Sequence, residues 1–429
     1  MKLSTVKPTQ KKVGLALSGG GFRAALFHVG LLAQLAEFRK LKEVETISTV
    51  SGGSIVGMIY YLHLKKWLES NDRPIQDEDY TEIVQAIESD LLNIVQKGFR
   101  TFGVRGLHKL YTMTGDELSE KLDEVFKSIL NEEHHLSLND LHIDPLYEQN
   151  KTPKIIVNTT SLNNGELWLF TSEVNDEIKQ YLDEMVKGEG HHNDESHCLT
   201  GFTVGKAVAA SAAVPAFIKP VTIKKDPLNI QLVDGGILDN LGTNSLLNEG
   251  CNHLIISDGS KYLEAKPKPS NFLINVIVRT QNIFINAIIR NNLNNIDIDQ
   301  EHIDMRYALP RYTRTNKELG EVNHGVNIKV QHYLSNIRTD LDSFSEVEAK
   351  SLMLLGYKFG LAEFSGMDFL RNLNRMKLNP NQDWQFKSIK QRFQNPDEDY
   401  LKELKVGEYS LFRRLRKRFA RLNKRRFRT

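Results

Sequence analysis

The chain has 429 residues, of which 40% are hydrophobic and 26% charged, and its 56 Lys and Arg residues nearly balance 54 Asp and Glu residues. This is the composition of a globular protein long enough for one large domain or two smaller ones. Two cysteines, Cys198 and Cys251, exclude a disulfide scaffold and favour a reducing compartment. No apolar leader segment and no run of about 18 apolar residues is present, so we expect a cytoplasmic protein that meets membranes only from the surface.

The first predicted elements are a buried strand at 13–17 and a helix at 24–38, separated by the turn Ser18-Gly19-Gly20-Gly21-Phe22-Arg23. Three glycines before a helix let backbone N–H groups converge on one point, where the helix dipole favours negative charge. A nucleophile that attacks an ester creates such a charge, the oxyanion. The turn is therefore a candidate oxyanion hole, formed by Gly19, Gly20, Gly21, Phe22 and Arg23.

A second predicted strand ends at Val50 and is followed by Ser51, Gly52 and Gly53, after which an apolar helix pattern begins at Ile55. A strand that turns sharply into a helix at a serine strains the backbone and leaves the hydroxyl exposed at the strand's end. Ser51 is therefore the candidate nucleophile, and Gly52 and Gly53 support the turn. An ordinary Ser-Gly-rich loop is the alternative interpretation.

Nucleotide binding is an alternative from a different class of function. The turn at 19–24 is one residue short of G-x-G-x-x-G, and a dinucleotide site requires an acidic residue at the end of the next strand. That strand ends instead in the segment 50–53, Val-Ser-Gly-Gly. Nucleotide binding is therefore the weaker hypothesis.

A helical insertion is predicted at about 75–150. Apolar residues at 80–95 and at 118–129 each fall on one helical stripe, and the second stripe opens with a capping box that begins at Thr114. Between the stripes, residues 97–113 mix aromatic and basic side chains. A mobile flap that contacts lipid and an ordinary packed connection both fit this composition.

Neither a metal site nor any other cofactor is predicted. Two strands at 155–158 and 167–171 are joined by a turn at 163–165, and the polar loop at 188–200 follows. This loop contains His191, His192, His197 and Cys198, but their spacing does not match zinc patterns, so a solvated loop is favoured. His28 lies in the first helix, where a catalytic triad histidine is weighed against a packing role.

A third motif begins at Asp234, where an apolar run delivers one carboxylate to a strand end. Such a group can take a serine proton directly or through water, without a histidine. Asp234 is therefore the candidate general base, and Gly235 and Gly236 keep its approach open. Free serine is a poor nucleophile, so a base of this kind is required.

The three motifs, Gly-Gly-Gly-Phe-Arg at 19–23, Ser-Gly-Gly at 51–53 and Asp-Gly-Gly at 234–236, together resemble the patatin-like phospholipases. The alanine- and serine-rich segment 207–217 and the segment 158–165 resemble further family signatures. The resemblance covers roughly residues 13 to 260.

It implies an α/β three-layer sandwich with a central, mostly parallel sheet, and a Ser–Asp dyad that hydrolyses phospholipid or neutral-lipid esters. Ser51 then matches the nucleophile, Asp234 the base, and residues 19–23 the oxyanion loop. Thr49 and Ala24 depart from the family pattern, which often has glycine at both positions. We expect them to strain the turn without loss of activity.

A boundary is predicted at 261–269, after which a helix-rich extension at 261–410 packs on the patatin-like core at 13–260. Within the extension, Ser343 and Glu346 form a predicted capping box at the start of a helix. Its purpose is not evident from the sequence.

The segment 411–429 has ten Lys and Arg residues and no acidic residue, which leaves 46 of the 56 basic residues against 54 acidic ones elsewhere. At about 100° per residue its leucines and phenylalanines share one side of a helix. Such a helix suits an anionic membrane surface. A terminal helix docked on its own domain is one alternative, and nucleic-acid binding is a weaker one.

The leading hypothesis is thus a serine acyl hydrolase that cleaves fatty-acyl esters of membrane phospholipids, as a phospholipase A or lysophospholipase does. A signal-regulated membrane-docking scaffold with weak hydrolysis is the alternative. Head group, acyl position, oligomeric state and the choice between hydrolysis and acyl transfer stay open.

Overall fold

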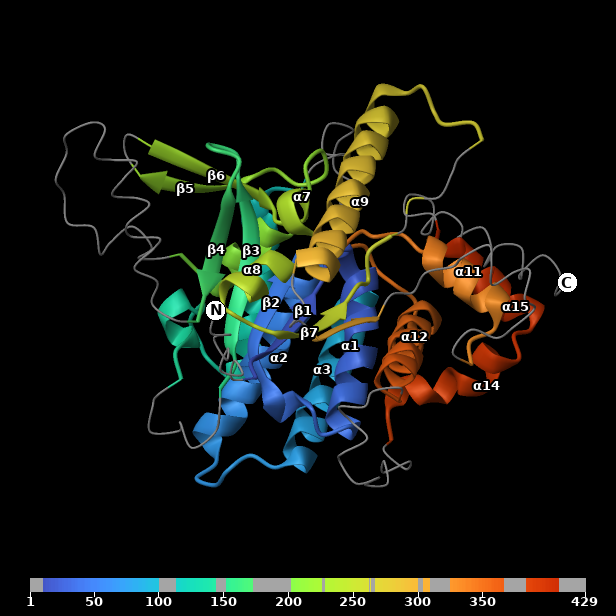
Figure 1. Cartoon of the computed structure of the whole chain (residues 1–429), viewed down its shortest axis with the longest axis horizontal. Helices are drawn as coiled ribbons and strands as arrows, with labels where there is room; N and C mark the ends of the chain where they lie inside the picture. Colours follow the sequence, from blue (N-terminus) through green and yellow to red (C-terminus); the bar gives the residue numbers. More distant parts are fainter. Residues whose placement is uncertain are drawn as a thin grey trace, which may run out of the picture.

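A sheet of eight strands runs through the described part of the chain in the order β5-β6-β3-β2-β1-β7-β8, with β4 paired to β3 (Figure 1). The coordinates are a computed structural model that describes residues 11–99, 113–143, 152–172, 202–225, 228–261, 263, 267–299, 304–308, 325–365 and 383–408. The strands are β1 Val13–Leu17, β2 Val44–Val50, β3 Lys154–Ser161, β4 Leu167–Thr171, β5 Val221–Lys225, β6 Leu228–Asp234, β7 His253–Ser257 and β8 Asp304–Ala308. The five strands β3-β2-β1-β7-β8 are parallel, whereas β4, β5 and β6 pair antiparallel, so the predicted mostly parallel sheet is confirmed.

Helices cover both faces of the sheet, because successive side chains of a strand point to opposite faces. In β1, Leu15 and Leu17 belong to a core shared with α1, α2 and α3, whereas Ala16 belongs to a second core with Leu246 of α8 and Ile289 of α9. These helices are α1 Gly21–Glu37, α2 Gly52–Ser70, α3 Asp77–Lys97, α8 Thr243–Asn248 and α9 Leu273–Asp299. The predicted three-layer sandwich is therefore confirmed.

The other described helices are α4 Gly115–Leu130, α6 Val204–Ser211, α7 Gly236–Asp239, α11 Ile328–Asn336, α12 Glu346–Ser365, α14 Lys390–Gln394 and α15 Glu398–Val406, with short 3-10 turns at Leu41–Glu43, Leu138–Leu141 and Gln385–Ile389. The predicted capping box at Thr114 is present: its hydroxyl accepts from the Glu117 amide at 3.1 Å. The box predicted at Ser343 is wrong by two residues. Ser345 and Glu348 form it instead, with the Ser345 amide donating to the Glu348 carboxylate at 2.6 Å.

Helix α12 packs directly against α1, and glycines make this approach possible. A Cβ atom at Gly30 would lie 1.9 Å from the Met353 carbonyl oxygen, and one at Gly356 would lie 2.0 Å from the Phe27 carbonyl oxygen. Only a residue without a side chain fits such a backbone contact. Helix α12, in the C-terminal region, is therefore part of the same helical layer as α1, which follows the glycine turn. The division of the chain at 260 and 410 itself stays a prediction.

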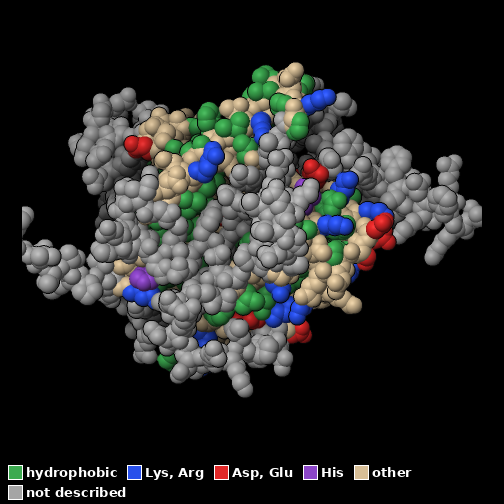
Figure 2. All heavy atoms as spheres, turned by 45° about the vertical axis from the view of Figure 1, so that its right-hand side comes forward, with side chains coloured by type: hydrophobic (Ala, Val, Ile, Leu, Met, Phe, Trp, Pro, Cys, Tyr) green, Lys and Arg blue, Asp and Glu red, His purple; other side chains and the backbone are tan. Residues whose placement is uncertain are grey.

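Helix α9 differs from the other long helices because much of its surface is exposed, and in Figure 1 its upper end projects beyond the sheet. Figure 2 shows hydrophobic side chains together with some Lys or Arg at this upper end of the molecule. None of the helices that the structure describes has both the length and the apolar content needed to span a bilayer.

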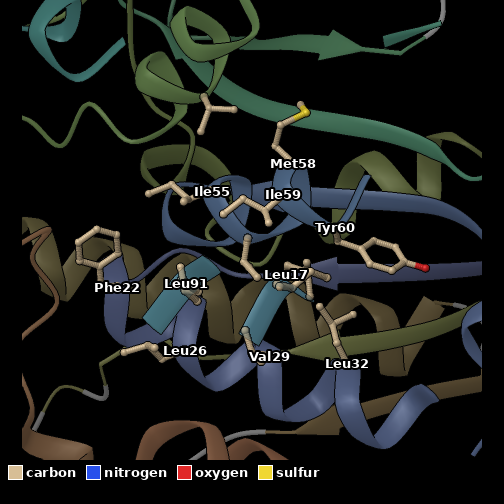
Figure 3. Close-up of a cluster of buried hydrophobic side chains, with 14 of the residues drawn as sticks. Leu17, Phe22, Leu26, Val29, Leu32, Ile55, Met58, Ile59, Tyr60 and Leu91 are labelled. Carbon is tan, nitrogen blue, oxygen red and sulfur yellow. The ribbon is translucent and has the colours of Figure 1, made fainter. Parts of the chain in front are cut away.

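The main hydrophobic core lies between the sheet and the first three long helices. In Figure 3, Leu17 of β1, Phe22 and Leu26 of α1, Ile59 of α2 and Leu91 of α3 converge, and all five are fully buried. Burying one such side chain contributes about 1.5–3 kcal/mol. Since β1 and β2 end in this layer, the core fixes the positions of the two turns that follow them, the glycine turn and the turn at Ser51.

Candidate active site

The turn between β2 and α2 places Ser51 in a backbone conformation that side chains rarely adopt. Ser51 has φ 53° and ψ −117°, although it is not glycine. Such a conformation costs on the order of 1–3 kcal/mol and persists only where the surroundings enforce it. The strained turn that the sequence predicts is therefore present.

Glycines on both sides of the site allow the backbone to close around Ser51. A Cβ atom at Gly52 would lie 2.0 Å from the Gly21 carbonyl oxygen, and one at Gly53 would lie 2.1 Å from the Leu17 carbonyl oxygen. The start of α2 thus rests against the glycine turn that precedes α1.

Thr49 fits the position where the family pattern has glycine because a neighbouring glycine makes room. Its methyl group would lie only 2.5 Å from a Cβ atom at Gly57, one and a half turns into α2. Its hydroxyl donates to the Ile156 carbonyl at 2.9 Å and accepts from Ser54 at 3.0 Å. The threonine is therefore packed and fully hydrogen-bonded.

Asp234, at the end of β6, is brought next to Ser51 by the sheet. The Ser51 side chain lies close enough to its carboxylate to lower the pKa of Asp234, and the Gly236 amide donates to the same carboxylate at 2.7 Å. Burial outweighs these two interactions and raises the pKa of Asp234 to about 6. A carboxyl group with this pKa can accept and return a proton near neutral pH.

The glycine turn meets Ser51 closely, but its amides are not equivalent. The Gly19 amide donates to the Asn240 carbonyl at 3.0 Å, and the Phe22 amide donates to the Asp340 carbonyl at 3.1 Å. The amides of Gly20 and Gly21 have no hydrogen-bond partner among the residues that the structure describes. The Arg23 amide likewise has no partner among the described residues, so these three amides are the donors of the predicted set that can hold an oxyanion, and Gly20 and Gly21 are the two within the glycine turn.

Arg23 points away from this site and fastens α1 to later parts of the chain. Only 2% of the residue is exposed, and its guanidinium donates to the carbonyls of Ser335 at 2.9 Å and Ser260 at 2.5 Å. Burial lowers its pKa to about 10, so it stays charged at neutral pH. These contacts favour a role for Arg23 in positioning the turn over one in binding a lipid phosphate.

His28 is a structural residue. Its Nε2 lies 3.0 Å from the Ser18 carbonyl, to which it must donate, and its Nδ1 lies 2.6 Å from the Ser257 hydroxyl, from which it accepts. Burial lowers its pKa to about 4, so the ring is neutral at physiological pH. With both nitrogens engaged, the packing role is confirmed and the triad role is not.

Two buried polar residues, Ser211 and Asn158, hold the elbow in place, although the sequence did not single them out. The Ser211 hydroxyl, at the end of α6, accepts from the Ser51 amide at 2.9 Å and donates to the Asn158 carbonyl at 2.6 Å. The Asn158 side chain donates to the Thr49 carbonyl at 2.9 Å. Both residues lie in segments that carry the family resemblance, so the sequence could have pointed to them, but only the folded chain shows what they contact.

Asn240 is a further residue that sequence reasoning missed. Its backbone carbonyl accepts from the Gly19 amide, and its side-chain oxygen would lie 2.4 Å from a Cβ atom at Gly19 and 2.5 Å from one at Gly236. Asn240 therefore fills the space between the glycine turn and the Asp234 turn, and both glycines are required for it to fit. Gly235 has a related role, because its Cβ atom would lie 2.4 Å from the Asn158 carbonyl oxygen.

The segment 338–342 caps the glycine turn from the C-terminal side. The Thr339 carbonyl oxygen would lie 2.4 Å from a Cβ atom at Gly21. Arg338 holds this segment: only 6% of it is exposed, and it pairs with Asp340 at 3.2 Å and with Glu348 at 3.1 Å. The glycine turn is thus braced by residues more than three hundred positions later in the sequence.

We predict that Arg338→Met destabilises the protein by about 2–3 kcal/mol, because the buried carboxylate of Glu348 then loses its partner. Urea unfolding would measure the change in the free energy of unfolding. The double variant Arg338→Met/Glu348→Gln is expected to recover part of the loss. Equal stability of Arg338→Met and the wild type would contradict the prediction.

No group of acidic, histidine or cysteine residues suited to a metal ion occurs within the described ranges. The predicted solvated loop at 188–200, most of the segment 97–113 and the tail at 411–429 lie outside the described residues. Cys251 is buried and free.

Comparison with known proteins gives one family and several loose structural likenesses. The family model of the patatin-like phospholipases matches residues 15–247. The structure is similar to that of VipD from Legionella pneumophila, with 13% identity, coverage of 83% of this chain and 67% of that one, and a TM-score of 0.36. It is also similar to human GIVD cytosolic phospholipase A2, with 12% identity, coverage of 84% and 62%, and a TM-score of 0.44.

At TM-scores this low, neither likeness assigns a function, and this chain spans only about two thirds of either protein. A search of curated proteins gives no match. The family model, by contrast, matches more than half of the chain and includes all three motifs. The chain therefore belongs to the patatin-like phospholipase family.

Proposed function

We propose that the protein is a serine acyl hydrolase that cleaves fatty-acyl esters of membrane phospholipids by a Ser51–Asp234 dyad. Family membership supports the general activity of a lipid acyl hydrolase. The observation that carries the specific proposal is the position of the strained Ser51 beside the buried carboxylate of Asp234, with which its side chain interacts. A strained serine beside a base of raised pKa is an arrangement typical of an activated nucleophile.

In the proposed mechanism, the Ser51 oxygen attacks the ester carbonyl carbon while its proton passes to Asp234. The amides of Gly20 and Gly21 hold the oxyanion that forms, at the N-terminus of α1 where the helix dipole favours negative charge. Asp234 then gives the proton to the leaving alcohol oxygen, and an acyl-serine remains. Water attacks the acyl-serine and passes a proton to Asp234, which returns it to the Ser51 oxygen as the acyl–oxygen bond breaks and the fatty acid leaves.

Two other functions, dinucleotide binding and a regulated scaffold, are the alternatives to this proposal. In a dinucleotide site, the glycine turn would lie beside a ribose-binding carboxylate, but here it lies beside Ser51, and a Cβ atom at Gly19 would be 3.3 Å from the Ser51 Cβ. A regulated scaffold with weak hydrolysis is compatible with the same geometry. We further propose that the tail at 411–429 binds anionic membrane surfaces.

The proposal is tested by incubating the protein with mixed phospholipid vesicles and resolving the products by mass spectrometry. Release of free fatty acid and lysophospholipid is the expected result, and the products identify which ester is cut. Absence of release on every lipid class would favour the regulated scaffold.

The pH dependence of this hydrolysis follows from Asp234. Its carboxyl group accepts a proton only when ionised, and burial raises its pKa to about 6. We therefore predict that kcat/KM rises about tenfold per pH unit below pH 6 and levels off above it. Fatty-acid release in a pH-stat would measure the profile. A rate that stays constant through about pH 5–8 would exclude Asp234 as the base.

A further inference from the structure

Helix α9 carries two apolar faces, of which only one is packed. On the packed side, Ile289 and Ile296 are buried in the second core, with Ile285 and Leu293 partly buried beside them. On the other side, the exposed fractions are 69% for Phe272, 71% for Leu273, 42% for Val276, 47% for Ile277, 43% for Ile283 and 63% for Phe284.

These exposed residues lie on one side of the helix. At about 100° per residue they lie within a sector of about 140°, and the packed residues lie on the opposite side of the helix. We call the surface formed by Phe272, Leu273, Val276, Ile277, Ile283 and Phe284 the α9 apolar face. Large exposed apolar side chains gathered in this way mark an interaction site.

The charges around the α9 apolar face indicate the partner. Between residues 265 and 296 the sequence contains the basic residues Lys266, Lys268, Arg279 and Arg290 and no acidic residue, whereas Glu264 precedes this stretch and Asp297 and Asp299 end α9 at its packed end. Apolar side chains interspersed with basic ones suit the interface of a phospholipid bilayer, whose phosphate groups are negative. Pairing with a second copy through this stretch would bring like charges together without a carboxylate of the same stretch to offset them, which is unfavourable.

The far end of α9 is attached to the candidate active site. The Asn292 side chain donates to the Asp239 carboxylate at 3.3 Å, and Asp239 ends helix α7, which starts two residues after Asp234. In Figure 1, α7 and α9 lie side by side, with the exposed half of α9 extending outward from the sheet. In Figure 2 hydrophobic and basic side chains are visible at this outer end.

We propose that the α9 apolar face is a membrane-docking surface that enters the headgroup layer of a phospholipid bilayer. Docking through this helix would hold the Ser51–Asp234 site beside the membrane, where the substrate of the proposed function lies, and the proposal relies on that function only for this consequence. The tail at 411–429 is a separate membrane contact and is not required for it.

A tryptophan placed on the face reports its insertion directly. In Phe284→Trp, mixing with vesicles of phosphatidylcholine and phosphatidylglycerol is expected to shift the tryptophan emission to shorter wavelength, and brominated lipids are expected to quench it. The matched control is Leu162→Trp, because Leu162 is also exposed, at 52%, but lies in the β3–β4 turn. The wild-type chain gives the background from its own tryptophans.

Replacing apolar residues of this surface by aspartate should weaken vesicle binding, which tests the same proposal by loss of function. Ile277→Asp/Phe284→Asp is expected to lower vesicle binding of the full chain by about tenfold or more, since binding scales with the apolar area that enters the interface. Leu162→Asp is expected to bind as the wild type does. Both variants should hydrolyse a short soluble ester at the wild-type rate, because neither changes the site around Ser51.

Emission from Phe284→Trp that vesicles neither shift nor quench would overturn the proposal. It would equally be overturned if Phe284→Asp abolished a concentration-dependent dimer and left vesicle binding unchanged, since the face would then join two copies. If Phe284→Trp inserts into vesicles but the wild type hydrolyses no ester, the docking proposal holds and the proposed hydrolase is refuted. If the wild type hydrolyses the soluble ester but Phe284→Trp does not insert, the proposed hydrolase holds and the docking proposal is refuted.

Discussion

Replacing Ser51 by alanine, or Asp234 by asparagine, is expected to lower kcat/KM for fatty-acid release by about 10⁴ or more, because nucleophile and base act as one unit. Without Ser51 there is no oxygen to form the acyl-enzyme. Without the Asp234 carboxylate, the serine proton has no acceptor among the groups we assign to the mechanism. The measurement is release of labelled fatty acid from phospholipid vesicles, with Ser128→Ala, an exposed serine of α4, as the control.

Stability measurements distinguish a catalytic loss from a folding defect in these variants. Because burial raises the pKa of Asp234 to about 6, its protonated form is the one that the fold favours. Its contribution to stability is therefore complete below the unfolded pKa of about 4 and is lost as pH rises through about 6, a change of up to about 3 kcal/mol.

Asp234→Asn removes this ionisation, and the amide oxygen can still accept from Gly236. We expect the variant to be inactive but at least as stable as the wild type at pH 8, and to show a flatter dependence of Tm on pH. An inactive variant that is also unfolded would say nothing about catalysis, whereas an active, folded Asp234→Asn would refute the dyad.

Replacing Gly356 by alanine is expected to destabilise the protein by about 3–4 kcal/mol, although alanine is the better helix former by about 1 kcal/mol. The added Cβ atom would lie 2.0 Å from the Phe27 carbonyl oxygen, which is backbone and cannot turn aside. Helices α1 and α12 must therefore separate, and the packing between them is lost. The free energy of unfolding in urea, followed by circular dichroism, measures the effect.

Gly360→Ala, one turn further along α12, is the matched control. Its Cβ atom would lie 3.2 Å from the Cβ of Gln34, a contact that a shift of a few tenths of an ångström relieves. The propensity gain and this modest crowding nearly cancel, so a change of less than about 1 kcal/mol is expected. Equal effects of the two substitutions would contradict a specific backbone contact at Gly356.

These contacts give the C-terminal helices a role in the site. Helix α12 packs on α1, whose first residues form the glycine turn, and Arg338 holds the segment that caps Gly21. Removing the C-terminal region would therefore expose the turn with the Gly20 and Gly21 amides, which we propose hold the oxyanion, as well as part of the core. In this protein the candidate site is completed by sequence that lies outside the matched family region of 15–247.

The local elements around the motifs were predictable because short-range rules decide them. The strands at 13–17 and 167–171 have the predicted bounds, and the Thr114 capping box forms as expected. Burial of apolar runs, glycine conformations and helix caps depend on a few neighbouring residues, which the sequence displays. The predicted cap at the start of α12 lies two residues too early because Ser343 and Ser345 are each followed, three positions later, by a glutamate, so both fit the capping-box pattern.

The sequence by itself determined the family, the three motifs and the order in which the strands present them. Only the tertiary structure decided which groups of those motifs are free to act. The amides of Gly19 and Phe22 look the same in sequence as those of Gly20 and Gly21, yet distant carbonyls of Asn240 and Asp340 accept from the first pair.

The same holds for the apolar segments of α9, whose composition suits a buried helix, although the residues of the α9 apolar face are exposed. In both cases the deciding contact joins residues far apart in the chain, and local pattern carries no information about such a contact.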